Sequence, residues 1–591
     1  MNRRISPRRP FQCLAAAALA VTAGAFVAAG AGCTQKVAAT SPLTPAMGEI
    51  PGDSNVQQVF RGTIRDHTLL VNDVPHNVSG FGLVGQLRGT GDCTASPAVL
   101  KYMTKEMVRR GFGDATLPGY KDVTHHAVLQ DPNYAVVRVD AWIPPGARKD
   151  DFCDAYVSCF EGNNTKSLVH GVLFEADLRT GGADVDNPAT LIHTHARAKG
   201  PIVVNPAYAL AVPEQAPAQA RASLRTGTVM FNTRVMQDRP LSLRLRKPQW
   251  SMSRHIEAVV KNHFRMTQDD APVAKAINEG IVELYVPRSF KGDWERFARV
   301  VQNLYMETSP EFDVAKAAEL AKKAAEPNAP LEEISYAMEA LGDRALPSLR
   351  PLMAHPDPRV SYWAARAAAY VGDETMVAQA RLAQVAATTN HPYRLAAVRA
   401  LGGLPNANSV NHLLRPLLDA NETLVRIEAY RMMAKNRAFP DMVVSPTGDP
   451  ENQKFYLDVV PGKAPPLIYV SRTGKPRIAI LGAVPEVRLD DATVVMDNRL
   501  TIAATPGRPT IATLHFRDPT QRMPVRALSR PGLDVLIARM AGMGPEGEAS
   551  MNFTYGEIVA VVQALVDGGK LKARNVMGDA LATSMVIQDP P

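Results

Sequence analysis

Three glycines, Gly80, Gly82 and Gly85, have the Gly-x-Gly-x-x-Gly spacing of a dinucleotide-binding turn. In that chemistry the third glycine opens a helix whose N-terminus holds a pyrophosphate. Here Gly89 and Gly91 follow almost at once, and each glycine inside a helix costs on the order of 1 kcal/mol. The run therefore predicts a short apolar strand that enters and leaves tight glycine turns. We expect no bound cofactor.

A thiol and two imidazoles offer a second chemistry. Cys93 lies upstream of His125 and His126, so a thiol–histidine pair can be drawn, although nothing in the spacing requires it. A zinc site would need these ligands to converge from separate segments, and no Cys-x-x-Cys or His-x-x-x-His spacing supports one. A thiol or metal enzyme is therefore the weakest of the alternatives.

Two further pairs have simpler explanations than catalysis. His193 and His195 would share one face of a strand, as metal ligands do, but a solvated pair in a strand beside a loop explains them more simply. Asp490 and Asp491 would point to opposite faces of a strand, so a solvated turn is the better interpretation. The chain has no Gly-x-Ser-x-Gly motif and no phosphate-binding loop. We therefore expect no catalytic residues.

The cysteines leave two alternatives open. If Cys153 and Cys159 lie on one strand, their Cα atoms are about 20 Å apart, whereas a disulfide needs about 4.4–6.8 Å. Cys93 could reach either of them, and an oxidising compartment would permit the bond. The sequence predicts either a bridge from Cys93 to Cys153 or Cys159, or three buried free thiols.

The first 32 residues have the pattern of a secretory signal, with a basic start, an apolar run from Leu14 to Ala29 and small residues before Cys33. Arg8-Arg9 resembles a twin-arginine export signal, but general secretion with a basic start is the simpler alternative. Gly30 to Cys33 resembles a lipoprotein cleavage box without its usual large aliphatic first residue. Lipidation of Cys33 and plain cleavage beside it both stay open.

Composition agrees with an exported globular protein. The chain has 591 residues, of which 46% are hydrophobic and 21% charged, so several domains are expected. The net charge of +8 falls to +4 without the four arginines of the leader. That is too mild to suggest nucleic acid, and no basic-aromatic motif is present. No later segment is long and apolar enough to span a bilayer, so we expect a protein that is at most anchored to a surface.

Clear local signals follow the glycine-rich run. Ser96 can cap a helix, Pro97 suits its first position and Gly111 can end it. The polar side of this helix is basic, with Lys101, Lys105, Arg109 and Arg110. In residues 133–148, Val137, Val139 and Ala141 alternate with Arg138 and Asp140, which predicts a strand that Pro144 and Pro145 stop.

Taken in order, these segments resemble the flagellar P-ring protein family. Residues 76–92 look like its "GYGLVVGLxGTGD" signature, and 133–148 look like "NVAAVMVTAxLPPFAR". Further matches fall at 151–177, 241–254, 278–287, 466–502 and 554–571, so the resemblance covers about 55–305 and 460–575. The residues that carry the family motifs are Gly80, Gly82, Gly85, Gly89, Gly91, Asp92, Pro144 and Pro145.

The resemblance implies a structural protein without catalysis. In the family, copies assemble into a periplasmic ring around the flagellar rod, in contact with L-ring proteins and peptidoglycan, and many copies in cyclic contact present one smooth inner wall. Candidate contacts for the rod or an anionic polymer are Lys101, Lys105, Arg109 and Arg110; the alternative is a solvated helix face.

A block foreign to this family separates the two matching regions. Arg366, Arg399 and Arg431 recur at intervals of 33 and 32 residues, each in a helical segment that follows a polar turn. This period resembles HEAT-type repeats, which stack helix pairs into a solenoid. Such an array either binds an unknown partner or serves as a spacer or stabilising cap. If it binds, a non-flagellar envelope lipoprotein scaffold is the main alternative function.

We therefore predict an α+β fold, in which a β-rich P-ring-like body carries an inserted all-α HEAT-like solenoid. The expected organisation is a signal peptide (1–32), a flexible linker (33–54), a P-ring-like region (55–308), the helical repeats (309–440), a return linker (441–463) and a P-ring-like C-terminal region (464–591). Ala438 to Lys463 could span up to about 85 Å, enough to return the chain to the body. Residues 311–440 should then be replaceable by a short linker without unfolding the remainder.

Overall fold

The computed structural model describes residues 57–112, 124–182, 193–206, 208, 217–264, 272–373, 375–405, 407–435, 443–446, 454–495, 499–517, 523–542 and 551–577. By its internal contacts Gly48–Pro591 forms one compact unit. The predicted signal peptide, Cys33 and the predicted linker 33–54 lie outside the described residues. The α+β prediction is confirmed.

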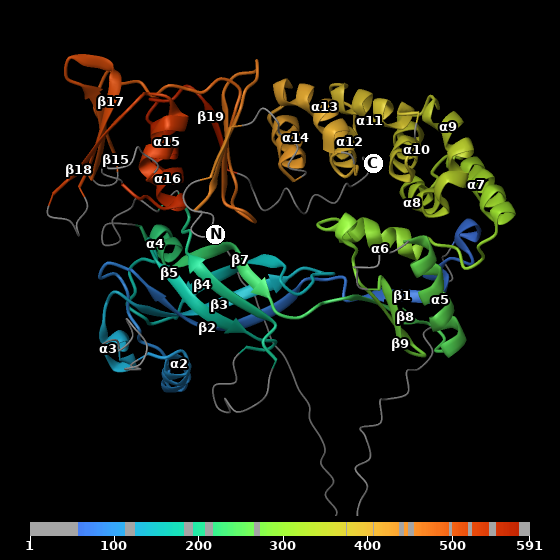
Figure 1. The fold of residues 1–591 in the computed structure, drawn as a ribbon, viewed down its shortest axis with the longest axis horizontal. Coiled ribbons are helices and arrows are strands. Elements are labelled where there is room, and N and C mark those ends of the chain that lie inside the picture. Colours follow the sequence, from blue (N-terminus) through green and yellow to red (C-terminus); the bar gives the residue numbers. More distant parts are fainter. Residues whose placement is uncertain are drawn as a thin grey trace, which may run out of the picture. The chain divides into compact units, whose positions relative to one another are not determined.

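Six antiparallel strands close into a barrel in the order β2-β3-β4-β7-β6-β5 (Figure 1). They are β2 (His76–Gly85), β3 (Ala135–Ile143), β4 (Phe152–Cys159), β5 (Val172–Leu178), β6 (Ala196–Pro201) and β7 (Thr226–Val235). The predicted alternation of β3 holds, because Val137, Val139 and Ala141 are fully buried inside the barrel core. The strand ends at Ile143, immediately before the two prolines.

One outer face of the barrel is covered by α2 (Pro97–Arg109) and α3 (His125–Gln130), while α4 (Ala218–Leu224) packs near β7. The predicted helix signals are used: the Ser96 hydroxyl accepts from the Val99 amide at 3.4 Å, and Pro97 takes the first helical position. Met103 and Met107 are buried against Leu83 of β2. This packing fixes the basic side of α2 relative to the barrel.

A smaller antiparallel sheet has the order β1-β8-β10-β9. Its strands are β1 (Thr68–Val71), β8 (Leu241–Leu245), β9 (Ala274–Asn278) and β10 (Ile281–Leu284). The short α1 (Ile64–His67), α5 (Trp250–His263) and α6 (Trp294–Gln302) share its apolar core. Two 3-10 turns, η1 (Gln58–Phe60) and η2 (Arg288–Phe290), flank these elements.

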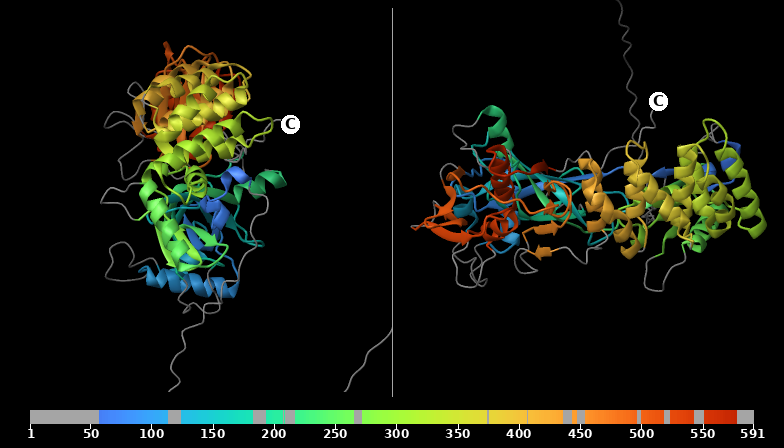
Figure 2. Two further views of the ribbon diagram at one scale, coloured as in Figure 1. Left: turned by 90° about the vertical axis from the view of Figure 1, so that its right-hand side faces the viewer. Right: turned by 90° about the horizontal axis from the view of Figure 1, so that it is seen from above.

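The block predicted to be helical consists of helices joined by short turns in its described part (Figure 1, Figure 2). It comprises α7 (Pro310–Ala324), α8 (Leu331–Leu341), η3 (Gly342–Ala345), α9 (Leu346–Met353), α10 (Pro358–Val371), α11 (Val377–Ala387), α12 (Arg394–Gly402), α13 (Ala407–Leu414), η4 (Arg415–Asp419) and α14 (Thr423–Lys435). Helices α8, α10, α12 and α14 pack in succession, and α9, α11 and α13 pack against them.

A repeated hydrogen bond supports the predicted period. The Ser361 hydroxyl donates to the Met353 carbonyl at 2.7 Å, eight residues earlier in the chain. At the next two repeats an arginine does the same: Arg394 Nε donates to the Ala386 carbonyl (2.9 Å), and Arg426 Nε to the Leu418 carbonyl (2.8 Å). The three donors are spaced by 33 and 32 residues, as Arg366, Arg399 and Arg431 are, so the period of the sequence is also a period of the structure.

The C-terminal region contains two sheets. A mixed sheet has the order β11-β12-β14-β13-β19, and an antiparallel sheet has the order β15-β16-β17-β18. The strands are β11 (Val443–Pro446), β12 (Tyr456–Val460), β13 (Leu467–Val470), β14 (Arg477–Leu481), β15 (Thr493–Val495), β16 (Leu500–Thr505), β17 (Arg508–Phe516), β18 (Val525–Ser529) and β19 (Arg574–Met577). Helices α15 (Leu533–Ala541) and α16 (Tyr555–Asp567) share one core with both sheets.

Two sequence predictions need correction here. The segment 441–463 contains β11 and β12, so strands of the mixed sheet interrupt the predicted linker. Gly80 and Gly82 lie within β2, not in a turn before it, because both are needed where this strand packs closely against its neighbours.

Candidate structural and interaction sites

The family-motif glycines close the barrel. A Cβ on Gly80 would lie 2.3 Å from the Asp177 carbonyl oxygen of β5, and a Cβ on Gly82 would lie 2.7 Å from Leu173. Real Cβ atoms essentially never come this close to another heavy atom. At Gly80 the neighbour is backbone, so only glycine allows β2 to approach β5 there, whereas at Gly82 the tip of the Leu173 side chain would have to shift. The three glycines of the apparent dinucleotide fingerprint lie in this strand and do not open a helix, as predicted.

The end of the motif forms a pinned loop. Gly89 has a left-handed backbone (φ +84°), which provides the predicted turn after the strand. The Asp92 carboxylate accepts hydrogen bonds from the Asn164 amide (2.7 Å) and from the Thr94 amide (3.0 Å). Burial opposes ionisation of Asp92, but these bonds outweigh it and leave its pKa below the ordinary value. Asp92 therefore joins the loop after β2 to the loop that follows β4.

Pro144 and Pro145 lie in a tight turn. The Ala147 amide donates to the Pro144 carbonyl at 3.3 Å, and Gly146, with φ +68°, completes the turn after Pro145. This turn ends β3 and directs the chain into β4.

A buried carboxylate of β5 holds α2 against the barrel. Asp177, whose side chain is 1% exposed, pairs with Arg109 at 2.7 Å and with Arg197 of β6 at 2.9 Å. Arg110 pairs with Glu175 at 2.9 Å. Burial raises the pKa of Asp177, but the bonds to the arginines prevail and lower it overall. Arg109 and Arg110, predicted as rod or polymer contacts, therefore have intramolecular partners that fix the helix.

No local pattern in the sequence indicates this network. Its members come from α2, β5 and β6, which only the closure of the barrel brings together. The other two predicted contacts, Lys101 and Lys105, are exposed on α2. Arg109 is also exposed, at 52% of its side chain, although it pairs with Asp177.

The three cysteines of the described residues are free thiols. The predicted bridge from Cys93 to Cys153 or Cys159 is not formed in this structure, because Cys93 packs under α2 and α3 while the other two contact the barrel core. Burial raises the pKa of Cys93 and of Cys153 to about 12, and that of Cys159 to about 11. Thiols held protonated in this way are poor nucleophiles.

The imidazole and acidic pairs also take structural positions. The Cys93 thiol donates to the Val128 carbonyl at 3.8 Å, while the His125 and His126 rings lie side by side on α3, 4.6 Å apart. His193 and His195 lie just before β6, so the prediction that they share a strand face is wrong, although the His195 backbone still donates to the Leu178 carbonyl and accepts from the Met236 amide.

Asp490 and Asp491 lie outside the strands, as the predicted turn requires, and they are 3.3 and 3.5 Å from Lys570. In the part of the chain that the structure describes, no three His, Cys, Asp or Glu side chains are grouped as metal ligands would be. Within the same residues, every helix is too short or too polar to cross a bilayer.

The motif residues thus serve barrel closure, turns and loop pinning. Residues 63–315 match the model of the family described as flagellar P-ring protein. The resemblance to this family that the motifs predict is confirmed for this region.

Two relatives carry the same description. The flagellar P-ring protein of Geotalea uraniireducens (strain Rf4) is 26% identical over 233 residues, which are 38% of this chain and 55% of that protein. The flagellar P-ring protein of Campylobacter lari (strain RM2100) is 27% identical over 247 residues, which are 41% of this chain and 63% of that protein. The chain therefore spans between about half and two thirds of the length of these curated relatives. The predicted C-terminal match, 460–575, lies beyond the family region and stays a prediction.

Proposed function

We propose that this protein is a structural subunit of a flagellar P ring, which assembles as many copies around the rod in the periplasm and associates with peptidoglycan. The observation that carries the proposal is the family match over residues 63–315, which contains the whole barrel and the smaller sheet. Cyclic assembly requires each subunit to present two different faces to its neighbours. The protein acts on this view as a bearing surface and has no catalytic step.

The architecture of the matched region suits that role. A closed barrel has no free strand edges, which makes it a rigid body. The ion pairs of Asp177 hold α2 in one position on it. Lys101 and Lys105, exposed on this helix, are the proposed contacts for an anionic partner, either the rod or peptidoglycan. Such contacts between exposed charges weaken as ionic strength rises.

Electron microscopy of basal bodies from wild-type and deletion cells tests the proposal. We expect rods without the periplasmic collar, and weak or absent swimming, when the gene is deleted. Normal basal bodies in the deletion strain would overturn it. A strain carrying Lys101→Glu and Lys105→Glu separates assembly from partner contact. The exposed pair Lys149→Glu and Lys199→Glu is the charge-matched control elsewhere on the barrel.

Export and anchoring are part of the same proposal. We propose that the leader directs export and that Cys33 is either lipidated or simply close to the cleavage site. A lipidated Cys33 predicts a membrane-bound protein whose N-terminal peptide carries diacylglycerol, and Cys33→Ala should release it. An unmodified N-terminus downstream of Cys33 would leave a periplasmic protein without an anchor.

The helical array supports an additional role, the binding of a partner. It lies almost entirely beyond the matched region, and stacked helical repeats present an extended surface of the kind that solenoids use for binding. The repeated Arg366, Arg399 and Arg431 are ion-paired to Glu339 or Glu428 within the array, so they hold the repeats together. We propose that it binds a protein partner that is additional to the ring. A deletion strain with normal swimming but loss of an envelope partner would favour a non-flagellar envelope scaffold instead.

A further inference from the structure

The four-stranded antiparallel sheet of the C-terminal region has open strand edges. Among the described residues, β15 and β18 are its outermost strands, and their backbone hydrogen bonds go to β16 and β17 respectively. An edge strand has backbone groups that point away from its neighbour, and these groups can pair with a further strand. Both edges of this sheet can therefore take part in an interaction between molecules.

Both edges have an exposed aliphatic side chain on the same face of the sheet. Helices α15 and α16 cover the other face (Figure 1). Leu528 of β18 is 45% exposed, and Val494 of β15 is 48% exposed. Strand pairing puts them on one face, because a single cross-strand row contains Val494, Thr501, His515 and Arg526, and Leu528 follows Arg526 by two residues.

The two edges have opposite charge. Arg526 of β18 and Arg530, which follows this strand, are both exposed. At the other edge, Asp490 and Asp491 precede β15, and their side chains are 64% and 83% exposed. Lys570 lies 3.3 and 3.5 Å from the two carboxylates. One lysine does not balance two aspartates, so this edge keeps an excess of negative charge.

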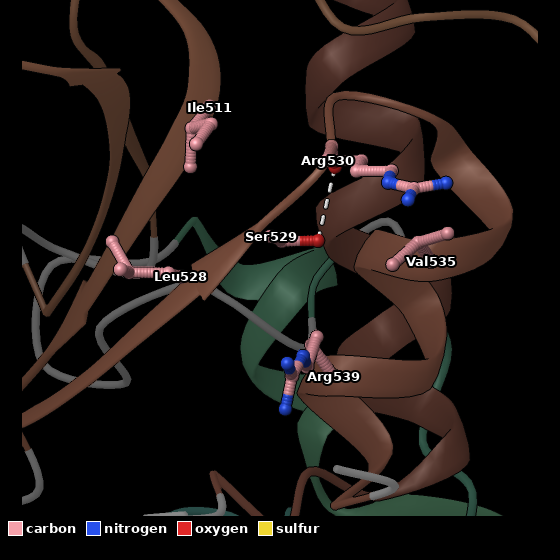
Figure 3. Close-up of a pocket in the computed structure, with 6 residues that line it drawn as sticks. All are labelled: Ile511, Leu528, Ser529, Arg530, Val535 and Arg539. Carbon is pink, nitrogen blue, oxygen red and sulfur yellow. Dashed lines mark hydrogen bonds between the residues drawn. The ribbon is translucent and has the colours of Figure 1, made fainter. Parts of the chain in front are cut away.

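A cavity beside Arg530 leaves room for a side chain from outside the sheet. It has a volume of about 360 Å³ and lies where β18 meets α15, and Figure 3 shows the residues that line it: Ile511, Leu528, Ser529, Arg530, Val535 and Arg539. None of these six residues is acidic. The end of β18 therefore offers an apolar and basic surface.

We propose that β18 of one subunit pairs with β15 of a second copy of the chain, so that the sheet continues from one subunit to the next. This inference rests on the proposed cyclic assembly and names a surface for it. The outer strands of a four-stranded antiparallel sheet run in opposite directions, so a translated copy adds an antiparallel strand. The end of β18 then lies beside the start of the neighbour's β15, which brings Arg530 close to Asp490 and Asp491 of that copy. Leu528 meets the neighbour's Val494 directly or diagonally.

The charges favour this head-to-tail contact over a two-fold one. Pairing two β18 edges would place arginines beside arginines, and pairing two β15 edges would place aspartates beside aspartates, which is destabilising. A head-to-tail contact joins opposite charges, and it extends from copy to copy or closes into a ring. Since β15 has three residues and β18 has five, we expect this pairing to be one of several contacts between neighbouring subunits.

Disulfide cross-linking of the full chain tests the contact. A chain with Val494→Cys and Leu528→Cys is produced in the deletion strain and oxidised with copper phenanthroline. Within one chain these positions lie three strand spacings apart, about 14 Å, whereas a disulfide needs about 4.4–6.8 Å between its Cα atoms. We therefore expect dimers, trimers and larger covalent species in non-reducing electrophoresis. Because a shift of two residues keeps every side chain on its face, Ala492→Cys with Leu528→Cys is tested in the same way.

The matched control is Val494→Cys with His515→Cys. His515 is exposed on the same face, but it lies on the inner strand β17, so this chain should give no series of covalent species. The native thiols are present in every sample and contribute equally to test and control.

Charge reversal supplies a second measurement. Arg530→Glu changes an exposed side chain, and it should lower the yield of covalent species several-fold because it places like charges together. Asp491→Arg in the same chain should restore the yield. No covalent series from either cysteine pair, dimers alone, or an unchanged yield with Arg530→Glu would overturn the contact. A normal ring without the covalent series refutes this contact alone, whereas the series together with normal basal bodies after gene deletion refutes the proposed function and leaves the contact standing.

Discussion

Glu339 of α8 offers the sharpest test of how the helical array is held to the rest of the protein. Its side chain is 5% exposed and lies between two guanidinium groups. Arg296, from α6 in the family-matched region, donates to it at 2.8 Å, and Arg366 of α10 lies 3.4 Å away. One carboxylate therefore joins the matched region to two helices of the foreign block.

The magnitude follows from burial. Removing one partner from a buried ion pair costs about 3–5 kcal/mol, because the remaining charge stays desolvated. Arg366 keeps its bond to Ser335 (3.0 Å) and its position 4.2 Å from the centre of the Tyr336 ring. We therefore expect the lower end of the range for Glu339→Gln, about 3 kcal/mol. Glu319, which pairs with Lys316 but is 50% exposed, provides the control, since Glu319→Gln should cost less than about 1 kcal/mol.

Hydrogen exchange measured by mass spectrometry resolves the effect by helix, which global unfolding of a large chain cannot do. Peptides from α6, α8 and α10 should all exchange faster in Glu339→Gln, and those of Glu319→Gln should match wild type. If Glu339→Gln changes exchange no more than the control does, the carboxylate is not an energetic link. If α8 and α10 respond while α6 does not, the array is coupled only to itself.

Three further outcomes are expected. Burial lowers the pKa of His263 to about 4; between pH 6.5 and 4 the unfolded chain therefore binds a proton that the folded chain does not. The free energy of unfolding therefore falls by up to about 3 kcal/mol as the pH is lowered from 6.5 to 4. Urea titrations at these two pH values should show that His263→Gln removes this part of the loss. Gly80→Ala should cost at least about 2 kcal/mol of stability, because its Cβ would meet the Asp177 carbonyl at 2.3 Å. The control Gly556→Ala in α16, whose Cβ would have its nearest contact at 3.7 Å, should be neutral or gain up to about 1 kcal/mol. An equal response of the two variants in thermal melts would contradict the packing argument. The three thiols of the described residues should react slowly with iodoacetamide at pH 8 and rapidly in denaturant, because burial raises each pKa; fast labelling of the native protein would show that they are accessible thiolates.

Local signals predicted the local structure well. The capping residue, the first-turn proline and the alternating strand before Pro144 all have the structure expected of them, because each depends on neighbours within a few residues. The helical period also recurs in the structure, because Ser361, Arg394 and Arg426 each donate to a carbonyl eight residues earlier. The resemblance to a known family supplied the order of the segments, which physical signals alone do not give.

Long-range closure could not be predicted. β2 pairs with β5, about 90 residues later, and this pairing explains both the glycines of β2 and the burial of Asp177. From the sequence, Gly80 suggested a turn and Arg109 a free basic surface. Both interpretations changed for the same reason, because Gly80 and Arg109 each contact Asp177 on the distant strand β5.

The helical block has clear boundaries in the sequence, but its apolar core continues into the segments on both sides. One continuous apolar cluster joins Val59 and Phe60 of η1 to the helices α7–α14 and then to residues of β12, β13 and β14. The link to the C-terminal sheet is also polar, since the Tyr430 hydroxyl of α14 donates to the fully buried Asp458 of β12.

Replacing residues 311–440 by a short linker would leave the apolar residues at both ends without cover. Those of the C-terminal sheet alone are Val460, Leu467, Tyr469, Ala479 and Leu481. A fully buried large apolar side chain contributes about 1.5–3 kcal/mol, so the loss approaches the whole stability of a typical domain, about 5–15 kcal/mol. This loss opposes the sequence-based hypothesis that the remainder stays folded without the helical block. We expect the linker variant to lose protease resistance first in β11–β14, while the barrel, whose core is separate, keeps its own. Uniform resistance in limited proteolysis would instead show that the array is an insertion on which the body does not depend.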